Sequence, residues 1–252
     1  MNTFKRLFPA LLPLIAVIAI AEAAVRAGWV RSYLVPAPSS VANAIIENRQ
    51  ELFTALFTTS ASALVGFVLS TIICIAIAVF LSSSKPIQRA FYPYAVFFQT
   101  VPIIAIAPLL VIWFGYGMKT VIASAFVVSI FPVIANTLNG ILSTDPALRD
   151  LFKLYGAGTL VTLFKLRFPS ALPQILTGLR VASGLAVIGA IVGEFIGGQG
   201  LGSVVDVART QQRVDKVFAA VLLASLLGLA LFGLINLVSH FTLRRWHASE
   251  QS

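Results

Sequence analysis

Long stretches without a charged side chain are the feature that most constrains this chain of 252 residues. A transmembrane helix needs about 20 apolar residues to cross about 30 Å of hydrocarbon. The stretches long enough for this are Leu52–Ser84, Ala90–Met118, Thr120–Thr144 and Val217–Leu243. Two further apolar runs contain isolated charges: the run from Leu7 continues past Glu22, and the run from Arg167 to Asp206 includes Arg180 and Glu194.

The composition agrees with a membrane protein, since 58% of the residues are hydrophobic and 11% are charged. Soluble domains contain about 25% charged residues. One cysteine excludes a disulfide scaffold or a cysteine-rich zinc site. Together with the uncharged part of the first run, Leu7–Ala21, these make five stretches in one short chain, which disfavours buried helices of a soluble protein. The first run is also longer than a cleaved signal core. We predict six spans, at about 7–27, 58–82, 90–115, 120–142, 172–197 and 217–242.

Lys and Arg near the ends of the spans predict the orientation, because cytoplasmic loops are enriched in them. With both termini in the cytoplasm, ten of these cations lie inside and seven lie outside. The net charge of +9 therefore indicates membrane orientation and contact with anionic lipid. No basic run with interleaved aromatics indicates nucleic acid. The inside set is Lys5, Arg6, Lys85, Arg89, Arg149, Lys153, Lys165, Arg167, Arg244 and Arg245; the outside set is Arg26, Arg31, Arg49, Lys119, Arg209, Arg213 and Lys216.

Two loops carry further signals. In the first external segment, Ser39 or Ser40 would cap a short helix that runs through Ile46. The longest polar interruption is the cytoplasmic segment 143–172. A connection between neighbouring helices needs only about 2–8 residues. The length of this segment therefore indicates that a partner grips it.

Within segment 143–172, Asp145 followed by Pro146 is typical of a helix start, with aspartate as cap and proline in the first turn. We expect a short helix over Ala147–Tyr155 that glycines end. A second helical piece is expected over Thr159–Arg167, before the prolines that open the fifth span.

The same segment resembles the permease subunits of ATP-binding-cassette importers. Their signature is Glu-Ala-Ala, three residues, glycine, nine residues, then Ile-x-Leu-Pro. Here Asp150-Leu151-Phe152, Gly156 and Leu166-Arg167-Phe168-Pro169 stand at that spacing. The acid is aspartate in place of glutamate, and leucine and phenylalanine replace the two alanines.

The flanking segments resemble the nitrate/sulfonate/taurine branch of that family, over about residues 34–240. They are Val35–Pro38, Gly66-Phe67, Val101-Pro102, Ala107–Leu109, Trp113–Gly115, Phe168–Pro173, Gly178–Arg180, Gly193-Glu194 and Gly200–Gly202.

The resemblance implies a type I importer permease: an all-α membrane protein of one domain, 1–252, in the bacterial cytoplasmic (inner) membrane, working by alternating access. The implied partners are a second permease copy, most simply as a homodimer, two cytoplasmic ATPase subunits and an extracytoplasmic substrate-binding protein. ATP and Mg²⁺ would bind the ATPase, and this chain would hold no cofactor. The implied substrate is a nitrate-, sulfonate- or taurine-like anion or a vitamin-precursor-type molecule.

By this resemblance, segment 143–172 would couple the permease to the ATPase. A short rigid helix transmits a rigid-body movement that a floppy loop would absorb. The predicted contact runs from Leu151 to Gly158, with Gly156 as the turn that no other residue replaces. The coupling residues are Asp150, Leu151, Phe152, Lys153, Tyr155, Gly156 and Gly158.

Arg180 and Glu194 are ionisable groups inside the fifth span, which makes them candidates for function. Arg180 would stabilise a gate, pair with a carbonyl group, or extend to the inner headgroups. Glu194 would contact the binding protein or line the outer mouth, or else accept hydrogen bonds from the N–H groups of Gly197–Gly202; we favour this structural role.

Pro102 and Pro108 should break the third span, because proline removes a helical hydrogen bond. Broken backbone is tolerated only against protein or a cavity, so this span should face the pathway. The candidates for a polar lining are Gln99, Thr100, Asn136, Asn139 and Ser183, with interhelical hydrogen bonding as the alternative for each.

Other function classes lack their motifs. No G-x-x-x-x-G-K-[ST] phosphate loop is present, so the chain is not itself an ATPase of that kind, and no H-E-x-x-H or G-x-S-x-G occurs. His240 and His247 have no companion at metal-ligand spacing, so no metal site is expected. An ion-coupled secondary transporter would show inverted repeats, and none is evident. A membrane-embedded enzyme would need acids or histidines at one depth, which Arg180 and Glu194 do not provide.

Overall fold

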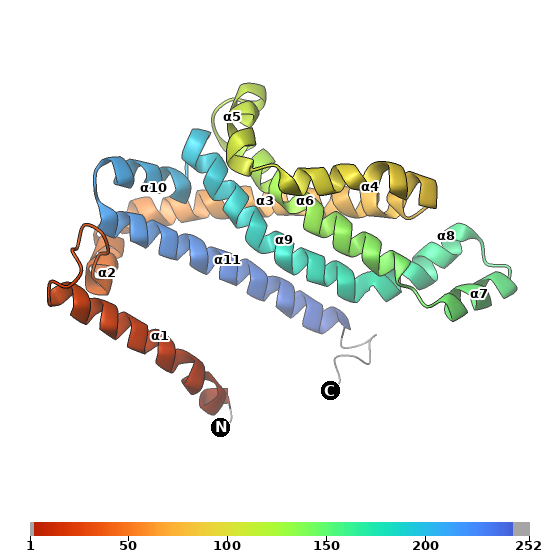
Figure 1. The fold of residues 1–252 in the computed structure, drawn as a ribbon, viewed down its shortest axis with the longest axis horizontal. Coiled ribbons are helices and arrows are strands. Elements are labelled where there is room, and N and C mark those ends of the chain that lie inside the picture. Colours follow the sequence, from red (N-terminus) through yellow and green to blue (C-terminus); the bar gives the residue numbers. More distant parts are fainter. Residues whose placement is uncertain (1–2, 244–252) are drawn as a thin grey trace.

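The computed structural model of the chain describes residues 3–243, without the side chains of residues 3–11 and of residue 14. Every element in this part is helical (Figure 1). The helices are α1 (Thr3–Arg26), α2 (Pro38–Glu47), α3 (Arg49–Leu81), α4 (Lys85–Thr100), α5 (Ile103–Phe114), α6 (Met118–Leu142), α7 (Pro146–Leu154), α8 (Thr159–Thr162), the π-helical turn η1 (Leu163–Arg167), α9 (Phe168–Gly197), α10 (Leu201–Thr210) and α11 (Val214–Leu243).

Among the described residues, four helical segments are long and apolar enough to cross a membrane singly. They are α3, α6, the continuous run Thr159–Gly197 and α11, and the bent pair α4 and α5 makes a fifth if it counts as one span. The first predicted span, 7–27, coincides with α1, much of whose side-chain structure lies outside the described part. The all-α membrane class is confirmed.

The core of the bundle is the packing of α6 against α9, with α3 alongside. Small residues let these backbones approach closely, as is common between membrane helices. A Cβ atom on Gly178 would lie 2.7 Å from the Pro132 carbonyl oxygen, and one on Gly189 would lie 2.7 Å from the Ser124 carbonyl oxygen. Larger side chains at these positions would force α6 and α9 apart.

The predicted third span, 90–115, is not one helix. The chain bends by 100° between α4 and α5, at Val101 and Pro102. Pro102 has no N–H group to continue α4, and it disfavours helical backbone at the residue before it. Pro108 lies inside α5, which continues past it to Phe114. The predicted break at Pro102 is therefore confirmed, the predicted break at Pro108 is wrong, and the size of the bend was not predicted.

The helix that contains the fifth predicted span, 172–197, extends beyond it at the start. The helix runs from Thr159 to Gly197, and its only irregularity is the π-helical turn η1. Pro169 cannot donate the hydrogen bond that an α-helix requires. The wider turn just before it, closed by the Phe168 N–H donating to the Leu163 carbonyl oxygen, keeps the helix continuous. The helix of the second predicted span, 58–82, likewise starts earlier than the span, since α3 begins at Arg49.

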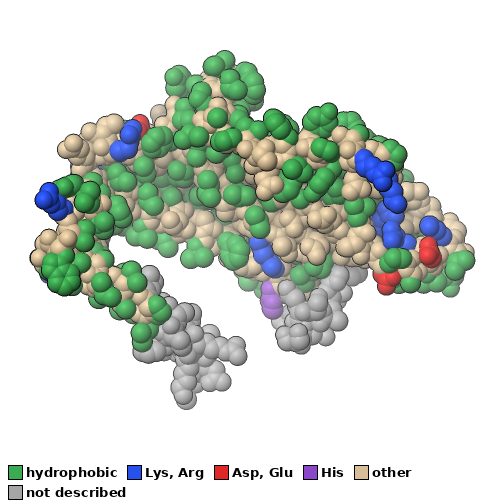
Figure 2. Space-filling view, viewed as in Figure 1, with side chains coloured by type: hydrophobic (Ala, Val, Ile, Leu, Met, Phe, Trp, Pro, Cys, Tyr) green, Lys and Arg blue, Asp and Glu red, His purple; other side chains and the backbone are tan. Residues whose placement is uncertain are grey.

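The two expected loop regions lie at opposite ends of the bundle, as the predicted topology requires (Figure 1). We call them the α10 end, formed by α2, α10 and the starts of α3 and α11, and the α7 end, formed by α7 and α8. Figure 2 shows apolar side chains over the middle of the visible face, with charged side chains gathered mainly towards these ends. Helix α1 lies apart from the bundle and joins it through α2.

The cap predicted for α2 is wrong. The helix begins at Pro38, and neither Ser39 nor Ser40 caps it with its side chain. The Glu22 carboxylate of α1 accepts hydrogen bonds from the Ser39 N–H at 3.0 Å and from the Ser39 hydroxyl at 2.7 Å. A neighbouring helix therefore satisfies the first turn, which no local pattern reveals.

Candidate functional site

Helix α7 begins as predicted. Asp145 stands at its N-cap, and the side chain accepts a hydrogen bond of 2.8 Å from the Ala147 N–H. Pro146 occupies the first turn, where its missing N–H group costs nothing. Both signals lie within three residues of sequence, so they define the start of α7 without help from the rest of the fold.

The end of α7 depends on one glycine. The Gly156 N–H donates to the Lys153 carbonyl oxygen and the Ala157 N–H to the Phe152 carbonyl oxygen, each at 2.9 Å. These two bonds form a Schellman motif, which requires left-handed backbone at the residue after the cap. Gly156 has φ +69° and provides it. Gly158, by contrast, has φ −66° and needs no glycine on conformational grounds.

The α7 end presents apolar side chains to its surroundings. Tyr155 and Leu154 are each 84% exposed, and Leu148, Leu151, Leu160 and Phe164 are also exposed. Phe152 is half-buried. Asp150 and Lys153 form an exposed ion pair of 3.3 Å on the same helix. A patch of this kind, rimmed by charges, is typical of a surface that a partner covers.

Of the predicted pathway residues, the structure brings Gln99 and Asn136 together. Both line a cavity of about 500 Å³ that lies at the bend between α4 and α5, against α6 and α9. The Asn136 side-chain amide also donates to the Pro132 carbonyl oxygen at 2.9 Å. The expectation that the broken span borders a cavity agrees with this arrangement.

The other polar candidates lie elsewhere. The Thr100 hydroxyl donates to Phe97 of its own helix, and Asn139 is exposed and does not line that cavity. Ser183 is buried, and its hydroxyl donates to the Arg180 carbonyl oxygen at 2.8 Å. Ser183 therefore makes the local bond that is common for serine in a helix.

Arg180 links two helices. Its guanidinium donates to the Ser239 hydroxyl of α11, and Ser239 is fully buried. The hydrogen bond ties α9 to the last turns of α11, so Arg180 uses a side-chain partner and not the backbone carbonyl that we considered.

Glu194 is buried at the α10 end, with 2% of its surface exposed. One carboxylate oxygen, Oε2, accepts hydrogen bonds of 2.9 Å from the Gly202 N–H and from the Thr59 hydroxyl. The Thr59 hydroxyl in turn accepts from the Leu201 N–H at 2.9 Å. The acid therefore joins α9, α3 and the start of α10, and its predicted bond to the glycine-rich turn is present.

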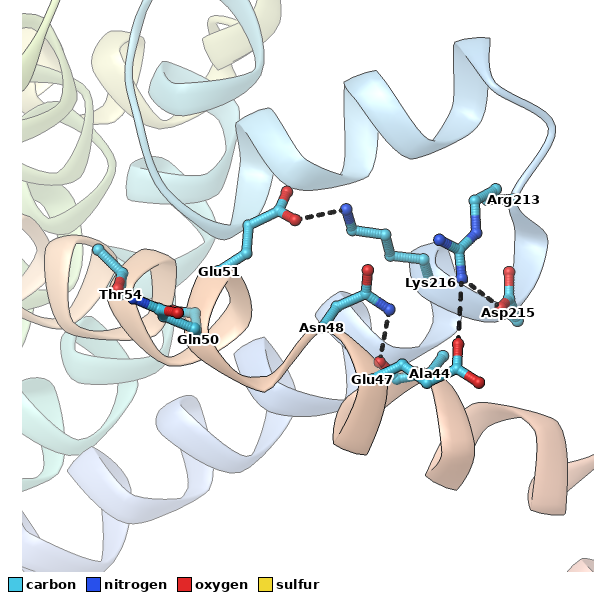
Figure 3. A network of polar contacts seen from close by, with 9 residues as sticks. All are labelled: Ala44, Glu47, Asn48, Gln50, Glu51, Thr54, Arg213, Asp215 and Lys216. Carbon is cyan, nitrogen blue, oxygen red and sulfur yellow. Dashed lines mark hydrogen bonds and ion pairs between the residues drawn. The ribbon is translucent and has the colours of Figure 1, made fainter.

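Sequence reasoning missed an ion-pair network at the α10 end (Figure 3). Lys216 of α11 is buried and pairs with Glu51 of α3 at 2.7 Å, as Figure 3 shows. Arg213 contacts Asp215 at 3.0 Å and Glu47 of α2 at 3.9 Å. These cations were counted only as markers of orientation. The sequence signal that could have revealed the network is the presence of acids beside these cations: Glu47 and Glu51 in the first external segment, and Asp206 and Asp215 in the last.

The described residues form a helical bundle with four or five candidate membrane spans and a projecting helix–glycine–helix, which is the architecture of a multi-pass membrane subunit, and similarity to known proteins gives its family. The family described as the binding-protein-dependent transport system inner membrane component matches residues 66–243. The chain belongs to this family.

Two relatives illustrate its range. A formylaminopyrimidine transport permease, ThiX of Halalkalibacterium halodurans, is 38% identical over 84% of this chain and 85% of its own. A putative aliphatic sulfonates transport permease, SsuC of Escherichia coli, is 29% identical over 88% of this chain and 86% of its own.

The fold is also similar to a solved structure of the MetNI methionine ABC transporter, with a TM-score of 0.68. That match covers 77% of this chain and 97% of the other at 16% identity, so it shows the fold alone. The chain is an ABC importer permease of the type I fold and a multi-pass protein of the inner membrane.

Proposed function

We propose that this chain forms the membrane pathway of an ATP-driven, binding-protein-dependent importer of a small solute, as a homodimer above two cytoplasmic ATPase subunits. ATP binding closes the two ATPases, the α7 helices move with them, and the bundle alternates between openings on the two sides. An external binding protein delivers the solute. The observation that carries the proposal is the α7 end, a rigid helix with an exposed apolar face.

The coupling contact consists of Asp150, Leu151, Phe152, Lys153, Tyr155, Gly156 and Gly158. Three physical features support it. The helix is capped at both ends within its own sequence, its apolar side chains are exposed, and the chain continues through α8 and η1 into α9 without a break. A force applied to α7 therefore reaches α9, which packs along α6 in the core.

This assignment puts the α7 end and both termini in the cytoplasm. The chain itself performs no covalent chemistry and holds no cofactor, while ATP and Mg²⁺ bind the ATPase subunits. Relatives named for formylaminopyrimidine, riboflavin and aliphatic sulfonates share this architecture. The architecture alone therefore does not select the solute.

The test is co-purification of the ATPase with the permease, using Gly156→Pro. Proline fixes φ near −65° and removes the N–H group, so it cannot adopt φ +69° or donate to Lys153. We expect Gly156→Pro to lose the ATPase and ATP-dependent uptake, while it elutes from size exclusion as the wild type does.

Gly28→Pro is the matched control. Gly28 also has a positive φ, +76°, and its N–H donates to the Val25 carbonyl oxygen, but it lies at the α10 end of the bundle. The control should keep the ATPase. Uptake driven by an ion gradient without any ATPase would contradict the proposal and favour a secondary transporter.

A further inference from the structure

The cavity at the bend between α4 and α5 has a chemistry of its own. Its volume of about 500 Å³ lies within the range of small-molecule sites, about 300–1,000 Å³. Its walls come from the end of α4, the start of α5, the middle of α6 and two residues of α9. It therefore lies where a transported molecule would contact four helices of one chain.

The lining combines flat apolar surfaces with two amides. Phe98 and Phe131 contribute aromatic rings, and Val128 and Val181 are among the aliphatic residues. The Asn136 amide donates one hydrogen bond to Pro132, and its Oδ1 oxygen receives none from the groups that the structure describes. Gln99 adds a second amide. Each amide has both donor and acceptor atoms.

No aspartate, glutamate, lysine or arginine is among the described residues that line this cavity. Arg180 precedes the lining residue Val181, but it does not itself line the cavity, and its guanidinium lies against Ser239 of α11. An anion placed here would therefore lose its hydration without gaining an opposite charge, which is strongly unfavourable.

The helix ends at the bend do not supply that charge either. The carboxyl end of α4 carries partial negative charge and the amino end of α5 carries partial positive charge. Both ends meet at Val101 and Pro102. The electrostatic potentials of these two partial charges oppose each other in the cavity. The terminal carbonyl groups of α4 and the terminal N–H groups of α5 remain as local hydrogen-bond acceptors and donors.

We propose that this cavity is the solute site of the permease and that its solute is an uncharged, planar heteroaromatic molecule with both donors and acceptors, not a sulfonate or an inorganic anion. This proposal rests on the function proposed above. The rings of Phe98 and Phe131 contact the faces of the solute, and the amides of Gln99 and Asn136 contact its edge.

The experiment measures binding to the permease–ATPase complex in lipid nanodiscs, without the external binding protein. The probes are radiolabelled formylaminopyrimidine, which is neutral, and radiolabelled butanesulfonate, which is an anion. Gln99→Leu and Asn136→Leu remove the amides at similar volume. Their matched controls are Thr100→Val, whose hydroxyl bonds its own helix, and Asn139→Leu, which lies outside the cavity.

We expect the pyrimidine to bind, and each amide variant to weaken it about tenfold, because a ligand hydrogen bond loses its partner. The two controls should bind as the wild type does. Val128→Phe, which fills the cavity, should abolish binding. Butanesulfonate should not bind to any of these proteins.

Three results would overturn the proposal: butanesulfonate binding that depends on Gln99 and Asn136, pyrimidine binding that neither amide variant changes, or no binding of either probe at millimolar concentration. The ATPase subunit is quantified in every nanodisc sample. Its loss from the wild-type complex would contradict the proposed function, whereas its retention with failed binding would contradict the solute site alone.

Discussion

At the α10 end, helices from distant parts of the chain are tied together by buried polar contacts, whereas the α7 end projects without such ties. Glu194 and Thr59 connect α9, α3 and α10 there, and Lys216 with Glu51 connects α11 to α3. At the α7 end, the ion pair of Asp150 and Lys153 stays within one helix, and the apolar side chains are exposed. The first end is held together by contacts within one chain, and the second is the surface that we propose a partner covers. Substitutions at the first should change the stability of the protein, and those at the second should change assembly.

The largest expected effect is that of Gly200→Ala at the α10 end. A Cβ atom on Gly200 would lie 2.2 Å from the Glu194 Oε1 atom, and the backbone has φ +153°. Steric conflict and strain together should destabilise the protein by about 3 kcal/mol or more. The measurement is the midpoint of thermal unfolding in detergent.

Gly184→Ala is the control for that substitution. It lies in α9, and a Cβ atom there has nothing within 4 Å. Alanine should leave the midpoint unchanged or raise it slightly, because alanine favours helix over glycine by roughly 0.5–1 kcal/mol. Equal losses from both variants would mean that the Glu194 contact does not hold the α10 end together.

The second effect is that of Glu51→Gln, which removes the partner of Lys216. The Lys216 side chain is 7% exposed, so it would be left as a buried charge without its carboxylate. Glu51 itself is 52% exposed, and water replaces part of the lost attraction. We expect a loss of about 1–2 kcal/mol, less than for a fully buried pair.

Glu47→Gln tests the same network at its exposed edge. Glu47 pairs with Arg213 at 3.9 Å and is 69% exposed, so its loss should cost less than about 0.5 kcal/mol. Thermal unfolding at low and high salt should show a larger salt effect for Glu47 than for Glu51, since exposed pairs are screened more. A larger salt effect for Glu51→Gln than for Glu47→Gln would contradict the burial of Lys216 in the network.

The contrast between the ends also explains what the sequence could predict. Helix α7 was predictable in start, end and exposure, because Asp145, Pro146 and Gly156 act within a few residues of one another. The class of membrane protein followed from uncharged runs alone. The coupling role came from spacing that resembles a family, and it stays a prediction.

The α10 end was less predictable, because its contacts join residues far apart in the chain. Thr59 lies 135 residues from Glu194, and Glu51 lies 165 residues from Lys216. The capping of α2 by Glu22 likewise depends on a neighbouring helix. The sequence singled out Glu194 as an acid within a span, but it did not indicate Thr59, or the pairing of Glu51 with Lys216.

The third prediction concerns Gly156→Ala, a milder change than proline. A non-glycine residue in left-handed backbone costs roughly 1–2 kcal/mol, and nothing within 4 Å of the added Cβ atom adds to it. The cost loosens the end of α7 without unfolding the bundle. We expect affinity for the ATPase to fall by about fivefold, measured by titrating the purified ATPase onto the permease in nanodiscs.

Gly158→Ala is its control, since φ −66° suits any residue and the added atom meets nothing within 4 Å. It should bind the ATPase as the wild type does. A larger loss from Gly158→Ala than from Gly156→Ala would place the essential contact after the turn and not in α7.

The smallest expected effect on stability is that of Lys153→Ala at the α7 end, with Arg209→Ala at the α10 end as its counterpart. Lys153 with Asp150 and Arg209 with Asp206 are both exposed pairs three residues apart in one helix. Each substitution should change stability by less than about 0.5 kcal/mol. Only Lys153→Ala should weaken binding of the ATPase, and the loss should shrink as salt is raised. Because both pairs join residues three apart on one helix, a difference in ATPase binding between the two variants measures the contact with the partner. Equal binding losses would mean that charge anywhere on the permease affects the ATPase, and the distinction between the two ends would fail.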